Sequence, residues 1–373
     1  MLNKLYEKAI CSECAGVSLG KYIELCGENE TCDYCKSSKK FVMTIEQLLP
    51  RMYKSWELYF SNFDDSSFHE EFRTPYYLSD IVDEIEVELN DANEKFIFDL
   101  KNIPEDRIWQ KDSEYWTPFS EALRLSWERF CTIVKTQWRY TYFLCENDSL
   151  DPASYSPTDT LENICMIIKS KDKLILEIPS NTPIFRCRKI DYKIKIDAKS
   201  LGTSPSKYAK ANRFSPKGIP MFYGSLDEKT CKTEVCRKGE YPVVGEFYNS
   251  RPIKVLDLTK IPQIPNLYDD DFNFIPALEF LHEFADSIGK RNTSENDLDY
   301  IPTQVFTEYI RRSLHDLNLK GIKYRSAENP DGINLALFYT NAECINEAEY
   351  NGMSDSLVFK TVLNATEDCK KFK

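Results

Sequence analysis

The sequence predicts an α+β fold, with a cysteine-rich start and a helical region followed by a domain of short strands and helices. Three observations lead to this prediction. Two Cys-x2-Cys pairs open the chain, apolar residues recur at helical spacing between residues 41 and 150, and short alternating segments mix with helical ones beyond residue 178. No Gly-x-Gly-x-x-Gly follows a strand, which disfavours a Rossmann-type hydride-transfer site.

Composition predicts a globular protein of the reducing cytoplasm. The chain of 373 residues is long enough for two domains. Its net charge of −12 disfavours a non-specific binder of nucleic acid or of an anionic membrane, although this balance leaves room for a local basic patch. No run of about 18 apolar residues predicts a transmembrane helix, and the first residues, MLNKLYEKAICSEC, lack the core of a signal peptide. The thirteen cysteines are mostly scattered, as in proteins of a reducing compartment.

Residues 1–40 predict a structural zinc site. The pair Cys11 and Cys14 and the pair Cys32 and Cys35 are separated by 17 residues, and two such knuckles supply four thiolates for a tetrahedron. Four cysteine ligands close the coordination sphere, so the expected role of the metal is structural rather than catalytic. Two alternatives stay open: the thiols are free or redox-active, or Cys26 replaces one of the four ligands.

Residues 41–150 predict a helical domain. Thr44 is the expected N-cap of a helix that begins at Ile45, and residues 78–89 form a second amphipathic segment. Residues 114–143 carry aromatic side chains every three or four positions. Such a stripe is typical of a buried core rather than of a cofactor site.

A polar stretch rich in Pro and Ser, residues 147–160, predicts a boundary, and residues 151–177 are expected to connect the two domains. A second domain is predicted at 178–345, with a C-terminal tail at 346–373. Short apolar or alternating runs predict its strands at 174–176, 183–186, 221–223, 253–258, 321–324 and 333–339. Longer periodic runs predict its helices at 228–237, 274–288 and 302–317.

The stretch from Arg213 to Glu234 combines a cation, an aromatic hydroxyl and a carboxylate. Proline and glycine residues place Arg213 in a turn, and Met221–Tyr223 is typical of a strand that enters the core. Asp227 is the expected cap of a helix on which Glu234 lies two turns in. Taken alone, Glu234 is either a solvated helix residue or a working acid.

The motifs around this stretch form an ordered set: Phe185-Arg186, Arg213 before a Gly-Ile-Pro turn, Phe222-Tyr223, Thr230-x3-Glu234 and Tyr324-x-Ser326. In this order, over roughly residues 178–340, the set resembles the RES domain family. The resemblance implies a fold similar to that of ADP-ribosyltransferases. It also implies an enzyme that destroys NAD by phosphorolysis or hydrolysis, as bacterial toxins of this family do. One departure is Thr230-Cys231, which stands where family members often have small residues such as Ala.

The resemblance implies roles for single residues. Cleavage of the nicotinamide–ribose bond passes through an oxocarbenium-like centre, which needs a fixed anion nearby. Arginine suits a pyrophosphate because its planar fork bonds two oxygens at once. Singly, each residue is more simply a surface cation, a core aromatic or a loop serine; the order of the set favours a site. The implied catalytic residues are Arg186, Arg213, Tyr223, Glu234 and Ser326. The implied NAD-binding residues are Arg186, Arg213 and Tyr223, with Arg188, Gln304 and Asn334 in support.

The N-terminal region resembles the HEPN-like domain that precedes some RES domains. HEPN ribonucleases carry Arg-x4–6-His, and none of the three histidines, His69, His282 and His315, has an arginine at that spacing. The region is therefore predicted to act as a scaffold, a sensor or a dimerisation module rather than as a ribonuclease.

These features predict an NAD glycohydrolase or NAD phosphorylase that serves as a bacterial toxin or antiphage effector. Two alternatives stay open: an ADP-ribosyltransferase that modifies a macromolecule, and a non-catalytic zinc-containing interaction protein. Stand-alone RES toxins are typically held by a small DNA-binding antitoxin. The expected partners are therefore NAD, an antitoxin or regulatory protein, and a second copy of the chain. The fused N-terminal domain is expected to occlude the site or to control assembly.

Overall fold

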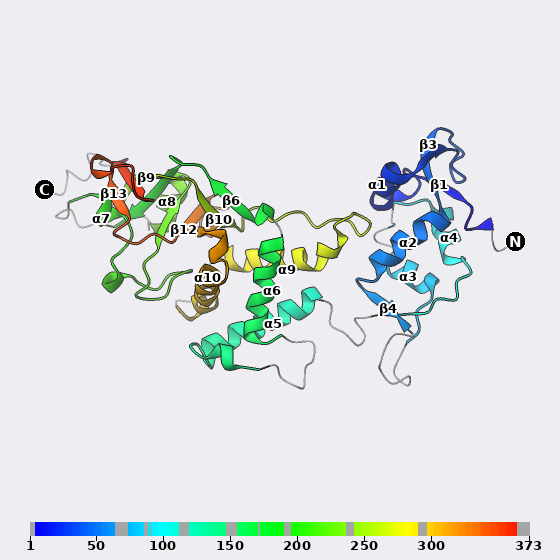
Figure 1. The fold of residues 1–373 in the computed structure, drawn as a ribbon, viewed down its shortest axis with the longest axis horizontal. Coiled ribbons are helices and arrows are strands. Elements are labelled where there is room, and N and C mark those ends of the chain that lie inside the picture. Colours follow the sequence, from blue (N-terminus) through cyan, green and yellow to red (C-terminus); the bar gives the residue numbers. More distant parts are fainter. Residues whose placement is uncertain are drawn as a thin grey trace. The chain divides into compact units, whose positions relative to one another are not determined.

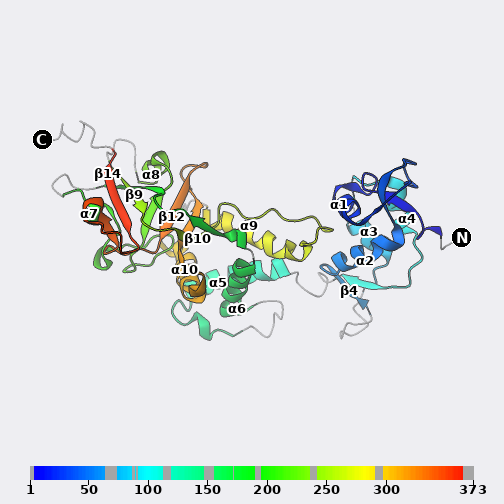
Figure 2. The same cartoon turned by 45° about the horizontal axis from the view of Figure 1, so that its top comes forward.

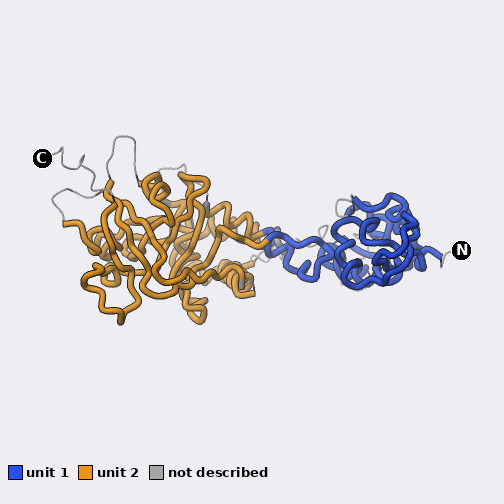
Figure 3. The backbone as a smooth tube through the Cα atoms, turned by 90° about the horizontal axis from the view of Figure 1, so that it is seen from above, with its two compact units in different colours: residues 1–122, 263–279 blue, residues 123–262, 280–373 orange. Residues whose placement is uncertain are grey.

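The computed structural model (Figure 1) describes residues 4–63, 74–85, 89, 91–111, 119–146, 155–170, 172–189, 195–235, 242–289 and 297–363. The chain forms two compact units (Figure 3). Unit 1 comprises residues 1–122 and 263–279, and unit 2 comprises residues 123–262 and 280–373. Residues 123–146, predicted as part of the helical N-terminal domain, belong to unit 2. The domain limits themselves stay predictions.

A small antiparallel sheet around the cysteine pairs opens unit 1. Its elements are β1 (Ala9–Cys11), α1 (Gly16–Cys26), β2 (Glu28–Glu30) and β3 (Lys40–Thr44), and the strand order is β1-β3-β2. The backbone turns after the first cysteine of each pair, since Cys14 N donates to Cys11 O at 3.0 Å and Lys36 N donates to Cys32 O at 2.9 Å. These turns bring the second cysteine of each pair back toward the first.

The rest of unit 1 packs short helices around an aromatic core. Its elements are α2 (Ile45–Trp56), β4 (Phe60–Asn62), α3 (Leu78–Glu84), α4 (Glu94–Lys101), β5 (Trp109–Lys111) and η9 (Phe272–Phe274). The predicted cap of α2 is confirmed, because the Thr44 side chain accepts a hydrogen bond from Gln47 N and the Gln47 side chain accepts one from Thr44 N. Such a cap contributes about 1 kcal/mol. Trp56 Nε1 donates to the Tyr268 hydroxyl at 3.2 Å, which ties residues 263–279 into this core.

Unit 2 combines helices with one large sheet. Its helices include η6 (Tyr142–Leu144), α6 (Pro157–Ser170), η10 (Asp297–Tyr300) and α10 (Ile301–Ser313), together with most of α5 (Phe119–Thr136) and of α9 (Ile275–Gly289), whose first residues belong to unit 1. On α5, Trp127 stacks on Phe130 at 5.0 Å between ring centroids and meets Phe284 of α9 edge-on at 4.9 Å. The aromatic stripe is core here, as predicted. Beyond Thr136 it is not, since Trp138 is 58% exposed.

Several predicted helices differ in extent from the observed ones. The helix predicted over 114–143 ends at Thr136, where the Arg139 guanidinium donates to the carbonyl oxygens of the last turn, while 112–118 lies outside the described residues. The helix predicted over 78–89 ends at Glu84. The connecting segment 151–177 contains α6 and leads through η7 (Asp172–Leu174) into the sheet.

The sheet of unit 2 has nine strands in the order β13-β14-β9-β7-β8-β12-β11-β10-β6 (Figure 2). The strands are β6 (Ile175–Ile178), β7 (Pro183–Arg188), β8 (Phe222–Ser225), β9 (Val243–Asn249), β10 (Ile253–Asp257), β11 (Leu319–Arg325), β12 (Ile333–Leu337), β13 (Cys344–Asn346) and β14 (Leu357–Val362). The pairs β10–β11 and β13–β14 are parallel, and the other neighbours are antiparallel. The predicted α+β class is confirmed.

The sheet consists of two halves, β13-β14-β9-β7 and β8-β12-β11-β10-β6, that meet at a seam between β7 and β8. Among the described residues, Phe185 and Ser225 are the only pair across this seam. The Arg186 guanidinium on β7 adds a contact across it by donating to the carbonyl oxygen of Tyr223 on β8. Helix α8 (Glu228–Val235) begins directly after β8, so its residues lie beside the seam.

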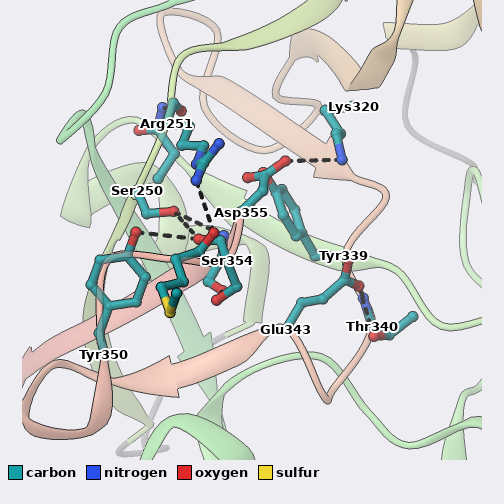
Figure 4. A network of polar contacts seen from close by, with 12 residues as sticks. Ser250, Arg251, Lys320, Tyr339, Thr340, Glu343, Tyr350, Ser354 and Asp355 are labelled. Carbon is teal, nitrogen blue, oxygen red and sulfur yellow. Dashed lines mark hydrogen bonds and ion pairs between the residues drawn. The ribbon is translucent and has the colours of Figure 1, made fainter.

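Residues 346–373, predicted as a tail, contribute β14 to the sheet, where it pairs with β9 and β13. Side chains anchor the loop before β14 (Figure 4). Arg251 Nη2 donates to Met353 O at 2.8 Å, and Asp355 accepts from the Tyr339 hydroxyl at 2.6 Å and pairs with Lys320 at 2.9 Å. In the described part of the chain, no helix combines the length and the apolar character needed to cross a membrane.

Candidate functional site

The four cysteines predicted to bind zinc converge in unit 1. The Sγ atoms of Cys11, Cys14, Cys32 and Cys35 lie within 4.8 Å of one another, and those of Cys11 and Cys35 are 3.8 Å apart. A tetrahedral zinc with Zn–S bonds of about 2.3 Å requires sulfur separations of about 3.8 Å, so this donor set fits the metal. Cys26 is exposed and does not belong to the cluster.

Hydrogen bonds and burial act in opposite directions on the thiols of this cluster. The backbone N–H groups of Cys11 and Tyr34 donate to Cys32 Sγ at 3.3 and 3.4 Å. Hydrogen bonds from Ser37 lower the pKa of Cys35 to about 6. Burial instead raises the pKa of Cys11 and of Cys14. Thiolates are the metal-binding form of cysteine, so a bound cation would have to favour that form at these two positions.

Two hollows differ sharply in the charge of their walls. A hollow of about 760 Å³ in unit 1 is lined by equal numbers of cations and acids: Lys4, Lys8, Lys36, Lys95, Glu7, Asp33, Glu94 and Asp99. A pocket of about 710 Å³ in unit 2 lies at the seam, and its charged lining residues are Arg186, Arg188, Lys189, Lys210, Arg213 and Glu234. The surplus of positive charge in the second pocket favours an anionic ligand.

Glu234, on α8, is the carboxylate of this pocket, and two hydrogen bonds hold the same oxygen of it. Ser326 Oγ donates to Glu234 Oε1 at 2.5 Å, and Asn334 Nδ2 donates to it at 2.7 Å. The Ser326 oxygen in turn accepts from the backbone N–H groups of Glu328 and Asn329, so its hydrogen is committed to Glu234. Hydrogen bonds to a charged group contribute about 1.5–3 kcal/mol each, and they fix the carboxylate in one orientation.

The orientation of the Asn334 amide is fixed from its other side. Ser225 Oγ donates to Asn334 Oδ1 at 2.6 Å, and the two residues are directly opposite in the β8–β12 register. Because a carboxylate only accepts hydrogen bonds, Nδ2 must face Glu234 and Oδ1 must face a donor. Ser225 is that donor, and it is 2% exposed.

A second loop is held against α8. Asn329 Nδ2 donates to Thr230 Oγ1 at 2.7 Å, and Thr230 Oγ1 donates to Asp227 at 2.7 Å. Gly332 is required here, because a Cβ atom at this position would lie 2.4 Å from Thr230 Oγ1. The predicted helix start at Asp227 is confirmed, since its carboxylate also accepts from Thr230 N at 2.7 Å.

Arg186 and Arg188 project from β7 into the pocket without a carboxylate partner among the described residues. Arg186 Nε donates to Leu201 O at 2.8 Å, and its guanidinium lies over the Phe222 ring at 4.8 Å. Burial, with the nearby charge of Arg188 as a smaller cause, lowers the pKa of Arg186 to about 9. Arg188 donates to Ser204 Oγ at 2.8 Å, and burial lowers its pKa also. A buried cation without an anion is unfavourable, so both arginines favour an anionic ligand.

Arg213 lies between two aromatic rings at the pocket wall. Its guanidinium carbon is 5.9 Å from the ring centroid of Tyr300 and 5.9 Å from that of Tyr324. The Tyr223 hydroxyl accepts from Phe214 N at 3.1 Å and lies 3.0 Å from Ser215 Oγ. Burial raises the pKa of Tyr223 to about 12, so this hydroxyl is neutral and holds the loop that carries Arg213.

Comparison with known proteins agrees with the residue pattern. Residues 183–359 match the family model of the RES domain, and residues 26–148 match that of HEPN/RES N-terminal domain 1. This chain carries a RES domain. No curated protein matches. A solved structure of the M. tuberculosis MbcT–MbcA toxin–antitoxin complex matches at 12% identity over 57% of this chain and 96% of that chain, with a TM-score of 0.31.

In the RES domain, most of the residues predicted for the site come together. Six of them line the pocket: Arg186, Arg188, Arg213, Tyr223, Glu234 and Asn334. Ser326 contacts Glu234, as described above. Gln304 lies elsewhere: its side chain is 6% exposed and donates to the backbone oxygen of Asn212 at 2.7 Å, so it supports the Arg213 loop.

The sequence alone does not identify most of the other residues that line the RES domain pocket, among them Tyr208, Ser225 and Tyr300. The role of Ser225 can be recognised only from the strand register, which places this residue opposite Asn334. Tyr300 ends η10 before α10, far from Arg213 in sequence, and no spacing rule links the two. Tyr208 lies in η8 (Ser206–Tyr208), a turn that no periodic pattern predicts.

Proposed function

We propose that the RES domain cleaves the nicotinamide–ribose bond of NAD, by phosphorolysis or hydrolysis, and that the chain serves as a toxin or antiphage effector. One observation carries the proposal: Glu234 is held by Ser326 and Asn334 in a pocket whose other charged walls are cationic. A fixed carboxylate among cations suits a substrate that is anionic and develops positive charge at one carbon. The RES family resemblance supplies the identity of that substrate.

Glu234 acts electrostatically in this proposal. Both hydrogen bonds reach Oε1, and Oε2 has no hydrogen bond among the described residues. The bond to nicotinamide breaks with its electron pair, which leaves nicotinamide neutral and the ribose carbon positive. The carboxylate stabilises this charge until water or phosphate bonds to the carbon.

The arginines bind the dinucleotide in this proposal. Arg186, Arg188 and Arg213 come from β7 and from the loop before β8, and all three line the pocket. A pyrophosphate gives Arg186 and Arg188 the anion that the described residues do not supply. Its binding energy orients the ribose toward Glu234.

We further propose that the four clustered cysteines hold one structural zinc ion. The proposal rests on the mutual distances of the four sulfur atoms and on the two backbone N–H groups that donate to Cys32 Sγ. The zinc would link the turn after β1 to the turn before β3 and thereby stabilise the start of unit 1.

The test of the enzymatic proposal is an NAD consumption assay on the purified full chain, with and without phosphate. Nicotinamide, ADP-ribose and ADP-ribose-1″-phosphate are separated chromatographically. Phosphate-dependent loss of NAD identifies a phosphorylase, and free ADP-ribose identifies a hydrolase. Nicotinamide release with ADP-ribose retained on a macromolecule identifies the alternative, an ADP-ribosyltransferase. Intact NAD under every condition contradicts all three readings for the full chain.

Restraint by the N-terminal region is proposed as well, and it requires a careful truncation. Deleting residues 1–150 would remove α5 and uncover the rings of Phe284 and Phe306 that pack on Trp127. Deleting residues 1–118 keeps this packing but removes the core of unit 1 on which Leu267, Tyr268 and Phe272 pack, so these three residues are changed to Ser in the same variant. Faster NAD turnover after the shorter deletion supports restraint, and unchanged turnover contradicts it.

Ser225→Ala is expected to lower kcat for NAD about tenfold, because loss of a buried hydrogen bond frees the Asn334 amide to rotate away from Glu234. KM is expected to change less than twofold, since the arginines are untouched. Ser225→Thr keeps the hydroxyl and is expected to restore most of kcat. A purely structural role would instead lower the melting temperature of both variants alike and leave kcat per folded molecule unchanged.

A further inference from the structure

Positive charge in this acidic chain is concentrated in one segment. Residues 186–217 contain ten lysines and arginines against two aspartates, in a chain whose net charge is −12. The proposed NAD site accounts for Arg186, Arg188 and Arg213. The proposal assigns no contact with NAD to the lysines of the segment.

The structure brings three of these lysines to one loop beside the pocket, here called the 206–218 loop. Gly218 N donates to Ala209 O at 3.0 Å, which closes the loop and places Lys217 next to Lys210. Lys207, Lys210 and Lys217 are all exposed, and among the described residues none of them forms an ion pair.

An exposed aromatic ring interrupts the lysines. Tyr208 is 65% exposed, and Lys207 Nζ lies 4.7 Å from the centroid of its ring. Tyr208 and Lys210 both line the pocket, so the loop forms part of its mouth.

Nearby groups do not neutralise the loop. Asp197 is the described acid of the segment, and its carboxylate accepts from the backbone N–H groups of Lys199 and Ser200 at the start of α7 (Ala198–Leu201). Lys199 itself donates to the carbonyl oxygens of Asn341 and Ala342. Lys199 and Asp197 are thus both engaged, whereas Lys207, Lys210 and Lys217 of the 206–218 loop have no ion pair among the described residues.

We propose that the 206–218 loop binds single-stranded nucleic acid at the mouth of the pocket. Lysines meet the phosphates, and a base stacks on the exposed ring of Tyr208. This combination of backbone-tracking cations with an aromatic platform is how proteins hold single strands without reading sequence. An acidic polypeptide would use the lysines but has no need of the exposed ring, so the observations favour the nucleic acid.

The test is fluorescence anisotropy of the full chain with labelled single-stranded DNA and RNA of about 16 nucleotides, a matched duplex, and a polyglutamate peptide. The single strands are expected to bind more tightly than the duplex and the peptide. With about three phosphate contacts, raising salt from about 50 to 200 mM is expected to weaken binding roughly tenfold to twentyfold.

Two variants and one control assign the binding to the loop. Lys207→Met/Lys210→Met/Lys217→Met is expected to weaken single-strand binding at least about tenfold and to flatten the salt dependence. Tyr208→Ala is expected to weaken it about tenfold at every salt concentration, because stacking is not electrostatic. The control removes three exposed lysines that also lack ion pairs among the described residues: Lys229, Lys254 and Lys260, each changed to Met.

Retained binding in the control with loss in the loop variants supports the proposal. Three outcomes overturn it: no anisotropy change with either single strand at low salt, equal losses in the two triple variants, or full affinity in Tyr208→Ala. Preferential binding of polyglutamate overturns it in favour of an acidic protein partner. None of these results depends on NAD turnover, so the binding proposal and the proposal of NAD cleavage are tested independently.

Discussion

Glu234→Gln is expected to lower kcat for NAD by about 10³-fold. The amide has the shape of the carboxylate and keeps an oxygen that accepts from Ser326 and Asn334, but it carries no charge to stabilise the oxocarbenium-like centre. The fold and the arginines are unaffected, so KM is expected to change only slightly. The measurement is steady-state NAD consumption of the variant beside the unmodified chain.

The matched control is Glu228→Gln, in the first turn of the same helix. Glu228 pairs with Lys232 at 2.5 Å, and the two side chains are 36% and 37% exposed; pairs so open to solvent contribute little. Its kcat is expected to stay within about twofold of the unmodified chain. If Glu234→Gln were to keep more than about a tenth of the turnover, the electrostatic role of Glu234 would be wrong.

Cys14→Ser is expected to release the zinc and unfold the start of unit 1. Structural zinc binding to four cysteines is worth about 10–16 kcal/mol, far more than the few kcal/mol by which a domain is stable. The measurement combines metal content by mass spectrometry with a thermal melt. One zinc per chain is expected in the unmodified protein and none in the variant, with a large drop in the melting temperature of unit 1.

Cys26→Ser serves as its control, because Cys26 is exposed and lies outside the cluster. This variant is expected to keep its zinc and its melting temperature. Loss of zinc in Cys26→Ser would contradict the assignment of the four ligands. A metal-free unmodified chain with an unchanged melt in Cys14→Ser would contradict the zinc proposal itself.

Sequence spacing predicted those parts of the molecule whose geometry is local. Two residues separate the cysteines of each pair, and a tight turn is enough to bring their sulfur atoms together. Asp227 and Thr44 cap their helices within three residues, so their roles could be predicted from short motifs. The order of Arg186, Arg213, Glu234 and Ser326 added the long-range part through family resemblance.

The features that could not be predicted from the sequence depend on strand register and on where helices end. Ser225 acts through Asn334, more than a hundred residues away, and only the pairing of β8 with β12 brings the two together. The helix after residue 119 ends at Thr136 although aromatic periodicity continues, because the Arg139 side chain satisfies the last carbonyl groups. Tyr268 enters the core of unit 1 from a segment that no periodic pattern links to it.

The seam between β7 and β8 has a mechanical consequence. A sheet resists opening through the backbone hydrogen bonds that cross each line between strands, and this line has one residue pair, Phe185 and Ser225. Both sides of the seam contribute to the pocket, with Arg186 on one half of the sheet and Asn334 on the other. An occupant that contacts both sides is therefore expected to stiffen the domain, and its departure is expected to return the sheet to its most compliant state.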